Sequence, residues 1–202
     1  MRRRGTRSAA VILAAWAVAA AAAGAESRPA KPETPESVTQ AYFDAMQAGR
    51  VKDAMEYMHP EALKQFRDTL LPLVEMVETM DKDRPARRRF FAMFDGVEDT
   101  AALRKLSHKA LVASLLKGIM KLQPGSRESL AKAKIKLIGH VKEGDSLAHV
   151  VYRMEVSVQG STASRVSAIS LRRHRAGWRL LLMTEIRNVV EMIRSSLSKK
   201  TP

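Results

Sequence analysis

The chain of 202 residues contains no cysteine, which excludes disulfide bonds, so its stability has to come from a buried core. Histidine is scarce as well. The five are spread along the sequence, and no two have the spacing of metal ligands on one helix or strand: His59, His108, His140, His149 and His174. We therefore predict no metal site. No motif in the sequence names a reaction, and we predict no cofactor and no catalytic residue.

The first 25 residues have the pattern of a secretory signal peptide. Four arginines, at positions 2, 3, 4 and 7, precede an apolar run over 9–23, and Ala23-Gly24-Ala25 is a small-x-small cleavage site. We expect cleavage after Ala25 and export to the periplasm or the extracellular space. An uncleaved anchor is the alternative, disfavoured because alanine is only weakly apolar. Residues 26–34, rich in proline, alanine and charge, predict a flexible tether.

Acidic residues are few, 21 against 35 lysines and arginines, and the formal net charge is +14. Cleavage would leave 177 residues (202 minus 25) with a charge of +10 (14 minus four arginines). That length suits a single domain, predicted over 35–198. For an exported protein, this charge argues against nucleic acid as a partner. It favours anionic lipid headgroups or acidic envelope polymers, or simply a solvated basic surface.

Residues 133–185 predict one antiparallel sheet of about four strands, over 133–141, 147–158, 163–174 and 178–185. Apolar residues alternate with polar ones, with Ala133, Ile135, Leu137 and Val141 on one face of the first strand and the even-numbered positions 148–158 inward on the second. Short segments containing glycine separate the strands. We expect this sheet to be curved.

The fourth predicted strand is apolar on both faces. Trp178 and Leu180 lie on one parity, and Leu181 and Met183 on the other. Because an antiparallel sheet commonly leaves one face in water, we expect this strand to be covered twice. A homodimer through the face that carries Leu181 and Met183 is the predicted second cover.

Helical periodicity dominates the rest of the chain. Thr34-Pro35-Glu36 predicts a helix start, and further helices are expected over 51–58, 60–80, 85–94, 107–122 and 186–197. Pro72 predicts a kink or break near Leu71. The fold class is therefore α+β, with N-terminal helices packed on the curved sheet, a helical insertion over about 66–122 and a C-terminal helix.

Several stretches resemble nuclear-transport-factor-2-like (NTF2-like, SnoaL-like) domains: 35–45 (PESVTQAYFDA), 48–54 (AGRVKDA), 58–62 (MHPEA) and 177–180 (GWRL). The resemblance implies a cone between helices and sheet. We expect Tyr42, Met46, Tyr152, Met154 and Trp178 to line a ligand pocket there. The long helical stretch and the final helix are also similar to lipid carriers of the MlaC or toluene-tolerance type.

Three functions are open at this point. The first is an exported, non-enzymatic domain that binds a small apolar or amphipathic ligand, or a protein partner. The second is a periplasmic lipid-binding or transport protein, and the third is a pocket enzyme of the isomerase or cyclase type. Such an enzyme needs an acid or base facing an apolar pocket, and no carboxylate lies on the predicted inward faces.

Two basic segments form a candidate surface. Arg87, Arg88 and Arg89 precede three phenylalanines, and Arg172, Arg173 and Arg175 lie at a turn. A basic segment beside an aromatic one could make a peripheral contact with an anionic membrane. The alternative, which we favour, is that Phe90 and Phe94 are the buried side of a short helix.

Overall fold

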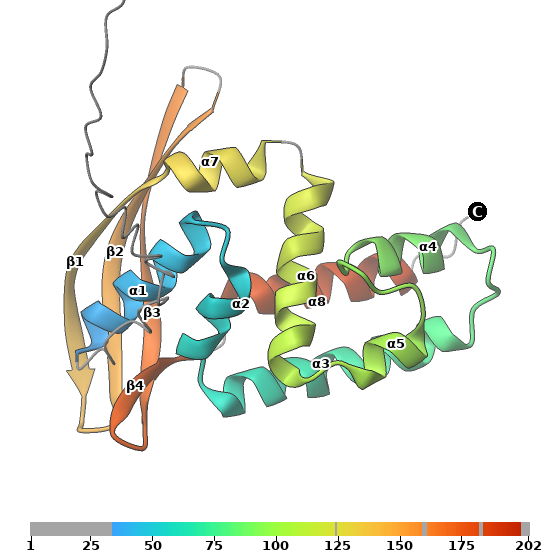
Figure 1. Ribbon diagram of the computed structural model, residues 1–202, viewed down its shortest axis with the longest axis horizontal. Coiled ribbons are helices and arrows are strands. Elements are labelled where there is room, and N and C mark those ends of the chain that lie inside the picture. Colours follow the sequence, from blue (N-terminus) through green and yellow to red (C-terminus); the bar gives the residue numbers. More distant parts are fainter. Residues whose placement is uncertain (1–33, 124, 159–160, 182–183, 199–202) are drawn as a thin grey trace, which may run out of the picture. The chain divides into compact units, whose positions relative to one another are not determined.

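A computed structural model describes residues 34–123, 125–158, 161–181 and 184–198 (Figure 1). The predicted signal peptide, nearly all of the predicted tether, and Met183 lie outside these residues. The first helices are α1 (Pro35–Gln47), α2 (Val51–Ala54), the 3-10 helix η1 (Met55–Tyr57), α3 (Pro60–Glu78) and α4 (Pro85–Ala92). The later ones are α5 (Thr100–Lys105), α6 (His108–Leu122), α7 (Ser126–Lys132) and α8 (Thr184–Ser198). None of these helices is long and apolar enough to cross a membrane.

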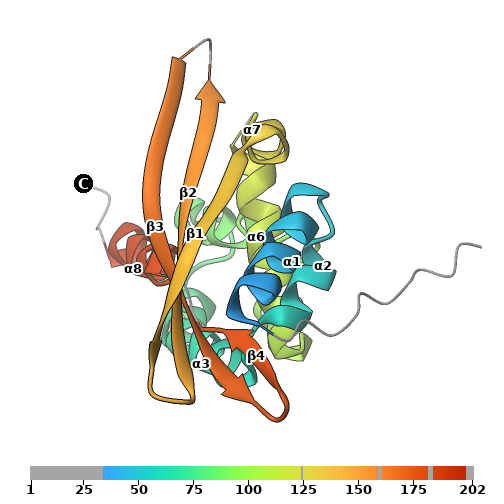
Figure 2. The ribbon, with the colours of Figure 1, turned by 90° about the vertical axis from the view of Figure 1, so that its left-hand side faces the viewer.

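The strands form one antiparallel sheet in the order β1-β2-β3-β4, as predicted, so the fold is α+β. They are β1 (Lys134–Glu143), β2 (Leu147–Val158), β3 (Ser161–His174) and β4 (Gly177–Leu180). Strand β2 pairs along its whole length with residues 161–172 of β3, whereas β4 pairs only with residues 171–174 of β3. The long β2–β3 hairpin therefore extends well past β4, as Figure 2 shows.

Helix α1 begins as the sequence predicts. The Thr34 hydroxyl accepts a hydrogen bond from the Ser37 amide at 3.1 Å, and the Ser37 hydroxyl accepts one from the Thr34 amide at 3.1 Å. This reciprocal capping satisfies two amides that lack helical partners. Helix α1 then lies across the inner face of the sheet and contacts β1, β2 and β4 (Figure 1).

Strand β1 departs from the predicted alternation. Its register with β2 shifts between Leu137 and Gly139, which is a β-bulge, and a bulge reverses which residues face each side. Val141, predicted inward, is consequently 63% exposed, and Ile138 is 54% exposed. His140 turns inward instead and pairs with Glu36 at the start of α1. Burial alone would raise the pKa of the Glu36 carboxyl, but the hydrogen bond to His140 lowers it.

Proline 72 does not break its helix. Helix α3 continues from Pro60 to Glu78 with Pro72 inside it. The proline is exposed, while Leu70, Leu73 and Val74 on the opposite side are buried. The lost backbone hydrogen bond therefore falls on the solvent side, where water can satisfy the free carbonyl, and packing holds both halves of the helix in place.

The fourth strand is shorter than predicted. It ends at Leu180, and α8 begins at Thr184 rather than at 186. Leu181 lies just past the strand, is half-buried, and donates its amide to the Ser170 carbonyl at 2.8 Å. Leu181 is outside β4 and Met183 is outside the described residues, so the dimer through these two residues stays a prediction.

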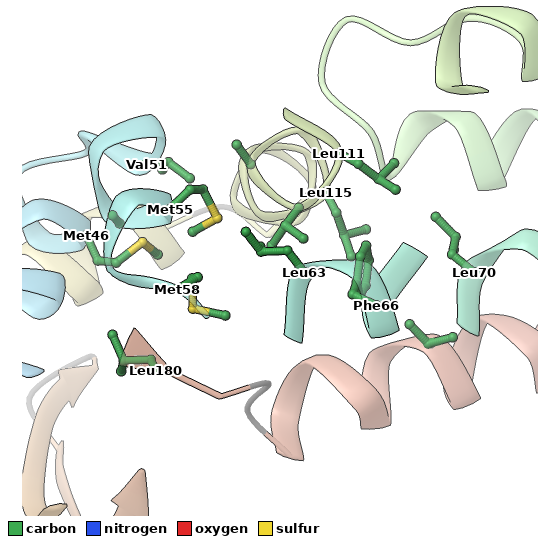
Figure 3. Packing of buried hydrophobic residues seen from close by; sticks show 14 of the residues in the cluster. Met46, Val51, Met55, Met58, Leu63, Phe66, Leu70, Leu111, Leu115 and Leu180 are labelled. Atoms are coloured by element: carbon green, nitrogen blue, oxygen red, sulfur yellow. The ribbon is translucent and has the colours of Figure 1, made fainter. Parts of the chain in front are cut away.

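Part of the core lies where α2, η1, α3, α6 and β4 meet (Figure 3). Met55, Met58, Leu63, Phe66 and Leu180 are each at most 2% exposed. The link between helices and sheet is also a backbone contact, because the His59 amide donates to the Leu180 carbonyl at 2.7 Å. The helical insertion is thus continuous with the core under the sheet.

Helices α6 and α4 meet at a glycine. A Cβ atom built on Gly118 would lie 2.0 Å from the carbonyl oxygen of Met93, which is a backbone atom and cannot rotate away. Nearby, the Ser114 hydroxyl donates to the Asp95 carbonyl at 2.8 Å, so the two segments are held at this distance. Only a residue without a side chain fits here.

We predict that Gly118→Ala lowers the free energy of unfolding by about 1–3 kcal/mol, because overpacking outweighs the roughly 1 kcal/mol of helix propensity that alanine gains. Urea denaturation followed by circular dichroism measures the change. Lys117→Ala, one residue earlier in the same helix, is the control and should change stability by no more than about 0.5 kcal/mol. A Gly118→Ala protein as stable as the wild type would contradict the close approach.

Candidate functional site

A cavity of about 370 Å³ lies between α1, α7 and the β2–β3 hairpin. Its lining residues are Tyr42, Phe43 and Met46 of α1, Leu130 of α7, Tyr152, Met154 and Val156 of β2, and Ala163, Ser164, Arg165 and Ser167 of β3. The lining is mainly apolar, with a few polar groups contributed by β3. A volume in this range lies at the small end of sites that bind small molecules.

The cavity exists because the helix above the sheet is short. Helix α1 has 13 residues and is about 20 Å long, whereas the 12 residues of β2 extend about 40 Å. Within the covered part, the Phe43 and Tyr152 rings are in contact, with centroids 4.9 Å apart. Beyond this contact, α1 cannot reach the far end of β2 and β3, and the cavity begins there.

Helix α7 closes part of the space that α1 leaves open. The Gln47 side-chain amide, at the end of α1, donates to the carbonyls of Leu130 at 3.1 Å and Ala133 at 2.6 Å. These two bonds tie the end of α7 and the start of β1 to α1. Leu130 is consequently positioned over the hairpin as part of the cavity wall.

The sheet presents one side of each strand to the cavity. Tyr152, Met154 and Val156 follow one another at every second position of β2, and their partners across the β2–β3 ladder are Ser167, Arg165 and Ala163. The even-numbered face of β2 predicted to be inward is therefore the inward face. On the same side, toward β4, Ala148, Val150, Ile169 and Leu171 are buried in the core.

Four of the five predicted pocket residues line this cavity: Tyr42, Met46, Tyr152 and Met154. The fifth, Trp178, does not. Trp178 is a residue of β4, is 2% exposed and belongs to the core. The Arg173 guanidinium lies 4.8 Å from the centroid of the Trp178 ring. Sequence reasoning missed Leu130, because no helix was predicted over 126–132, and missed the polar residues of β3, because polar side chains carry no signal of burial.

The first basic segment has a structural role in part. The Arg87 guanidinium donates to the carbonyls of Val77 at 3.3 Å and Met80 at 2.8 Å, near the end of α3, and lies 5.7 Å from the centroid of the Phe91 ring. Phe90, Phe91 and Phe94 are buried. Arg88 and Arg89 are exposed. The aromatic half of this candidate surface therefore belongs to the core, as the favoured interpretation expected.

The second basic segment lies on the β3–β4 hairpin. Arg172 is directly opposite Arg179 in the ladder, and Arg172, Arg173 and Arg175 are all exposed. Like charges directly opposite each other are unfavourable. No carboxylate in the described part of the chain forms an ion pair with Arg172 or Arg179. This end of the sheet is therefore strongly basic.

His59 lies beside that basic hairpin and caps α3, as predicted for a helix-start residue. Its Nδ1 accepts a hydrogen bond from the Glu61 amide at 3.1 Å, and its ring centroid is 5.2 Å from that of His174. Burial lowers the pKa of His59, and the nearby His174, Arg172 and Arg179 lower it further, against an opposing effect of Glu61. The surroundings of His59 therefore favour its neutral form, which is the direction of the lowered pKa.

The described structure offers little for acid–base or metal chemistry. The described residues of the cavity lining include no carboxylate and no histidine, and Asp44 is exposed on α1. On the outer face of the sheet, the His149 ring lies 3.0 Å from the Ser170 hydroxyl and 3.2 Å from the Glu143 carboxylate. These three side chains lie outside the cavity, on a regular antiparallel sheet. The backbone amides around them form hydrogen bonds between strands, so they are not available to stabilise the oxyanion that a serine-dependent hydrolysis would form. No metal-binding cluster occurs among the residues described.

No protein-family model, no curated protein and no solved structure matches this chain.

We predict that protonation of His59 contributes to the loss of stability at acidic pH. The unfolded chain takes up a proton on this residue near pH 6.5, whereas the folded protein, with its lowered pKa, does so only at lower pH. Its contribution to stability is therefore complete above about pH 6.5 and is lost as the pH falls below that value. In His59→Asn, which keeps a capping oxygen, Tm should fall less between pH 7.5 and pH 5.5 than in the wild type.

Thermal melts followed by circular dichroism measure this difference. His108→Asn is the matched control, because His108 is also at the start of a helix but is exposed. Equal losses of Tm in the wild type and in His59→Asn would show that burial beside the basic hairpin does not influence His59.

Proposed function

We propose that this protein is an exported, non-enzymatic domain that binds a small apolar or amphipathic ligand in the cavity between α1, α7 and the β2–β3 hairpin. The observation that carries the proposal is the cavity itself, about 370 Å³ in volume and lined mainly by aromatic, methionine and aliphatic side chains. Apolar surface that a ligand removes from water here contributes about 25 cal/mol per Å². Its volume favours a single chain or a small ring system over a lipid with two chains.

Two further observations favour binding over catalysis. The methionines at 46 and 154 have flexible, polarizable side chains, which adapt to ligands of different shape. Among the described residues, the lining also has no carboxylate or imidazole of the kind that a proton-transferring enzyme places against its substrate. An isomerase or cyclase of the pocket type is therefore the weaker candidate.

We also infer that the domain is NTF2-like. Helices that precede a curved antiparallel meander, with a cavity between them, are the arrangement that the resemblance of 35–62 and 177–180 implies. Export remains a proposal based on the N-terminal pattern of arginines, apolar residues and a small-x-small site. Together they suggest a binding protein of the cell envelope.

We predict that a neutral apolar probe, N-phenylnaphthylamine, binds the protein and becomes fluorescent, and that Met154→Trp lowers its affinity at least about tenfold because the larger ring fills the cavity. Fluorescence titration measures the affinity, and circular dichroism checks that the variant is folded. Met76→Trp, a partly exposed position on α3 away from the cavity, is the control and should bind as the wild type does. Unchanged binding by a folded Met154→Trp would place the ligand elsewhere.

A further inference from the structure

One side chain of the cavity lining carries a charge. Arg165 is on β3, opposite Met154 in the β2–β3 ladder, and it lines the cavity along with the apolar residues. In the part of the chain that the structure describes, no carboxylate lies within ion-pair distance of Arg165, whereas lysines such as Lys64 and Lys109 have acidic partners. An arginine at the edge of an apolar cavity, without an acidic partner, is suited to an anion from outside.

The position of Arg165 determines where such an anion would lie. Strand β4 pairs with β3 only over residues 171–174, so Arg165 is on a stretch of β3 that β4 leaves unpaired. Arg165 is exposed, whereas Met46 of α1, across the cavity from the sheet, is buried, and so is Tyr152 on the neighbouring strand β2. A ligand with its chain against the methionines would therefore have its other end at the edge of the sheet, beside the guanidinium and in contact with water.

The chemistry of the guanidinium narrows the ligand class. Its planar array of donors binds a carboxylate or a phosphate through two parallel hydrogen bonds, and it remains charged at every physiological pH. Uncharged head groups gain only ordinary hydrogen bonds there, and cationic ones are repelled. The Ser167 side chain, two residues along β3 and on the same face of the sheet, lines the same wall and supplies a further donor.

We propose that the ligand of this cavity is a single-chain anionic amphiphile, a carboxylate or a phosphate monoester, whose chain packs against Met46 and Met154 and whose anionic group binds Arg165. This inference rests on the proposed function, because it assumes that the cavity binds an apolar chain. It adds the charge and the orientation of the ligand.

The test is displacement of N-phenylnaphthylamine by dodecanoate, dodecyl phosphate and dodecanol at pH 7.5 and low salt. The two anions are used below their critical micelle concentrations and dodecanol below its solubility limit. The variants are Arg165→Gln and, as a control with the same change of net charge, Arg153→Gln. Arg153 is on the neighbouring strand β2, where it pairs with Val166. Its position in the strand places it on the face of the sheet away from the cavity. Circular dichroism confirms that both variants fold.

We expect dodecanoate or dodecyl phosphate to displace the probe from the wild type at a concentration about tenfold lower than dodecanol does. Whichever anion displaces it at the lower concentration identifies the preferred head group. In Arg165→Gln the advantage of the anions should disappear with little change for dodecanol, while Arg153→Gln should keep it.

Two results would overturn the inference. If dodecanol competes as well as both anions, or if Arg165→Gln and Arg153→Gln behave alike, the guanidinium does not select the ligand, although the proposed function still holds because the probe binds. If the wild type does not bind the probe or any of the three amphiphiles, the proposed function fails and the inference fails with it.

Discussion

The contact between α1 and the inner face of the sheet is the constraint on which the rest of this structure depends. The Phe43 and Tyr152 rings meet at its centre, Glu36 and His140 pair at one end, and Gln47 binds two carbonyls at the other. These contacts hold the helix across one part of the sheet. Because α1 is about half as long as β2, holding it there leaves the far end of the β2–β3 hairpin uncovered, and the cavity follows from that difference in length.

The same sheet thus carries a packed core over one part of its length and a cavity over another. Toward β4, the inward residues Ala148, Val150, Ile169 and Leu171 are packed in the core with the helical insertion. Toward the hairpin tip, the same face of the same strands lines a cavity. A cavity costs stability, because the residues around it lose packing partners. A large core elsewhere offsets that cost, which explains why a chain without disulfide bonds can keep an open pocket.

Local patterns in the sequence predicted much of this arrangement. The strict alternation of 148–158 identified the inward face of β2, and Thr34-Pro35 identified the start of α1, because both depend on residues close together in sequence. Tyr42, Met46, Tyr152 and Met154, which the sequence suggested would lie together, line one cavity. Trp178 lies in the core instead, since a buried aromatic residue in the core and one in a pocket have the same pattern.

The features that were missed depend on contacts distant in sequence. The bulge near Gly139 places Val141 and His140 on the faces of the sheet opposite to those that the alternation predicted. The bulge can be recognised only from the pairing of β1 with β2. The part of β3 that lines the cavity has small or polar side chains, which give no pattern of burial. The position of Arg165 at the cavity follows from its pairing with Met154 and from the early end of β4, and both are long-range features of the fold. Charge and periodicity alone could not distinguish it from the other arginines.

The central claim is that a chain-like ligand lies between α1 and the hairpin, and NMR with methyl-labelled methionine tests it most directly. With bound dodecanoate, the account predicts nuclear Overhauser effects from the ligand chain to the methyl groups of Met46 and Met154. It predicts none to Met55 and Met58, which are 1% and 2% exposed in the core. Contacts to the second pair without the first, or no contacts to any methionine while the ligand is bound, would contradict it.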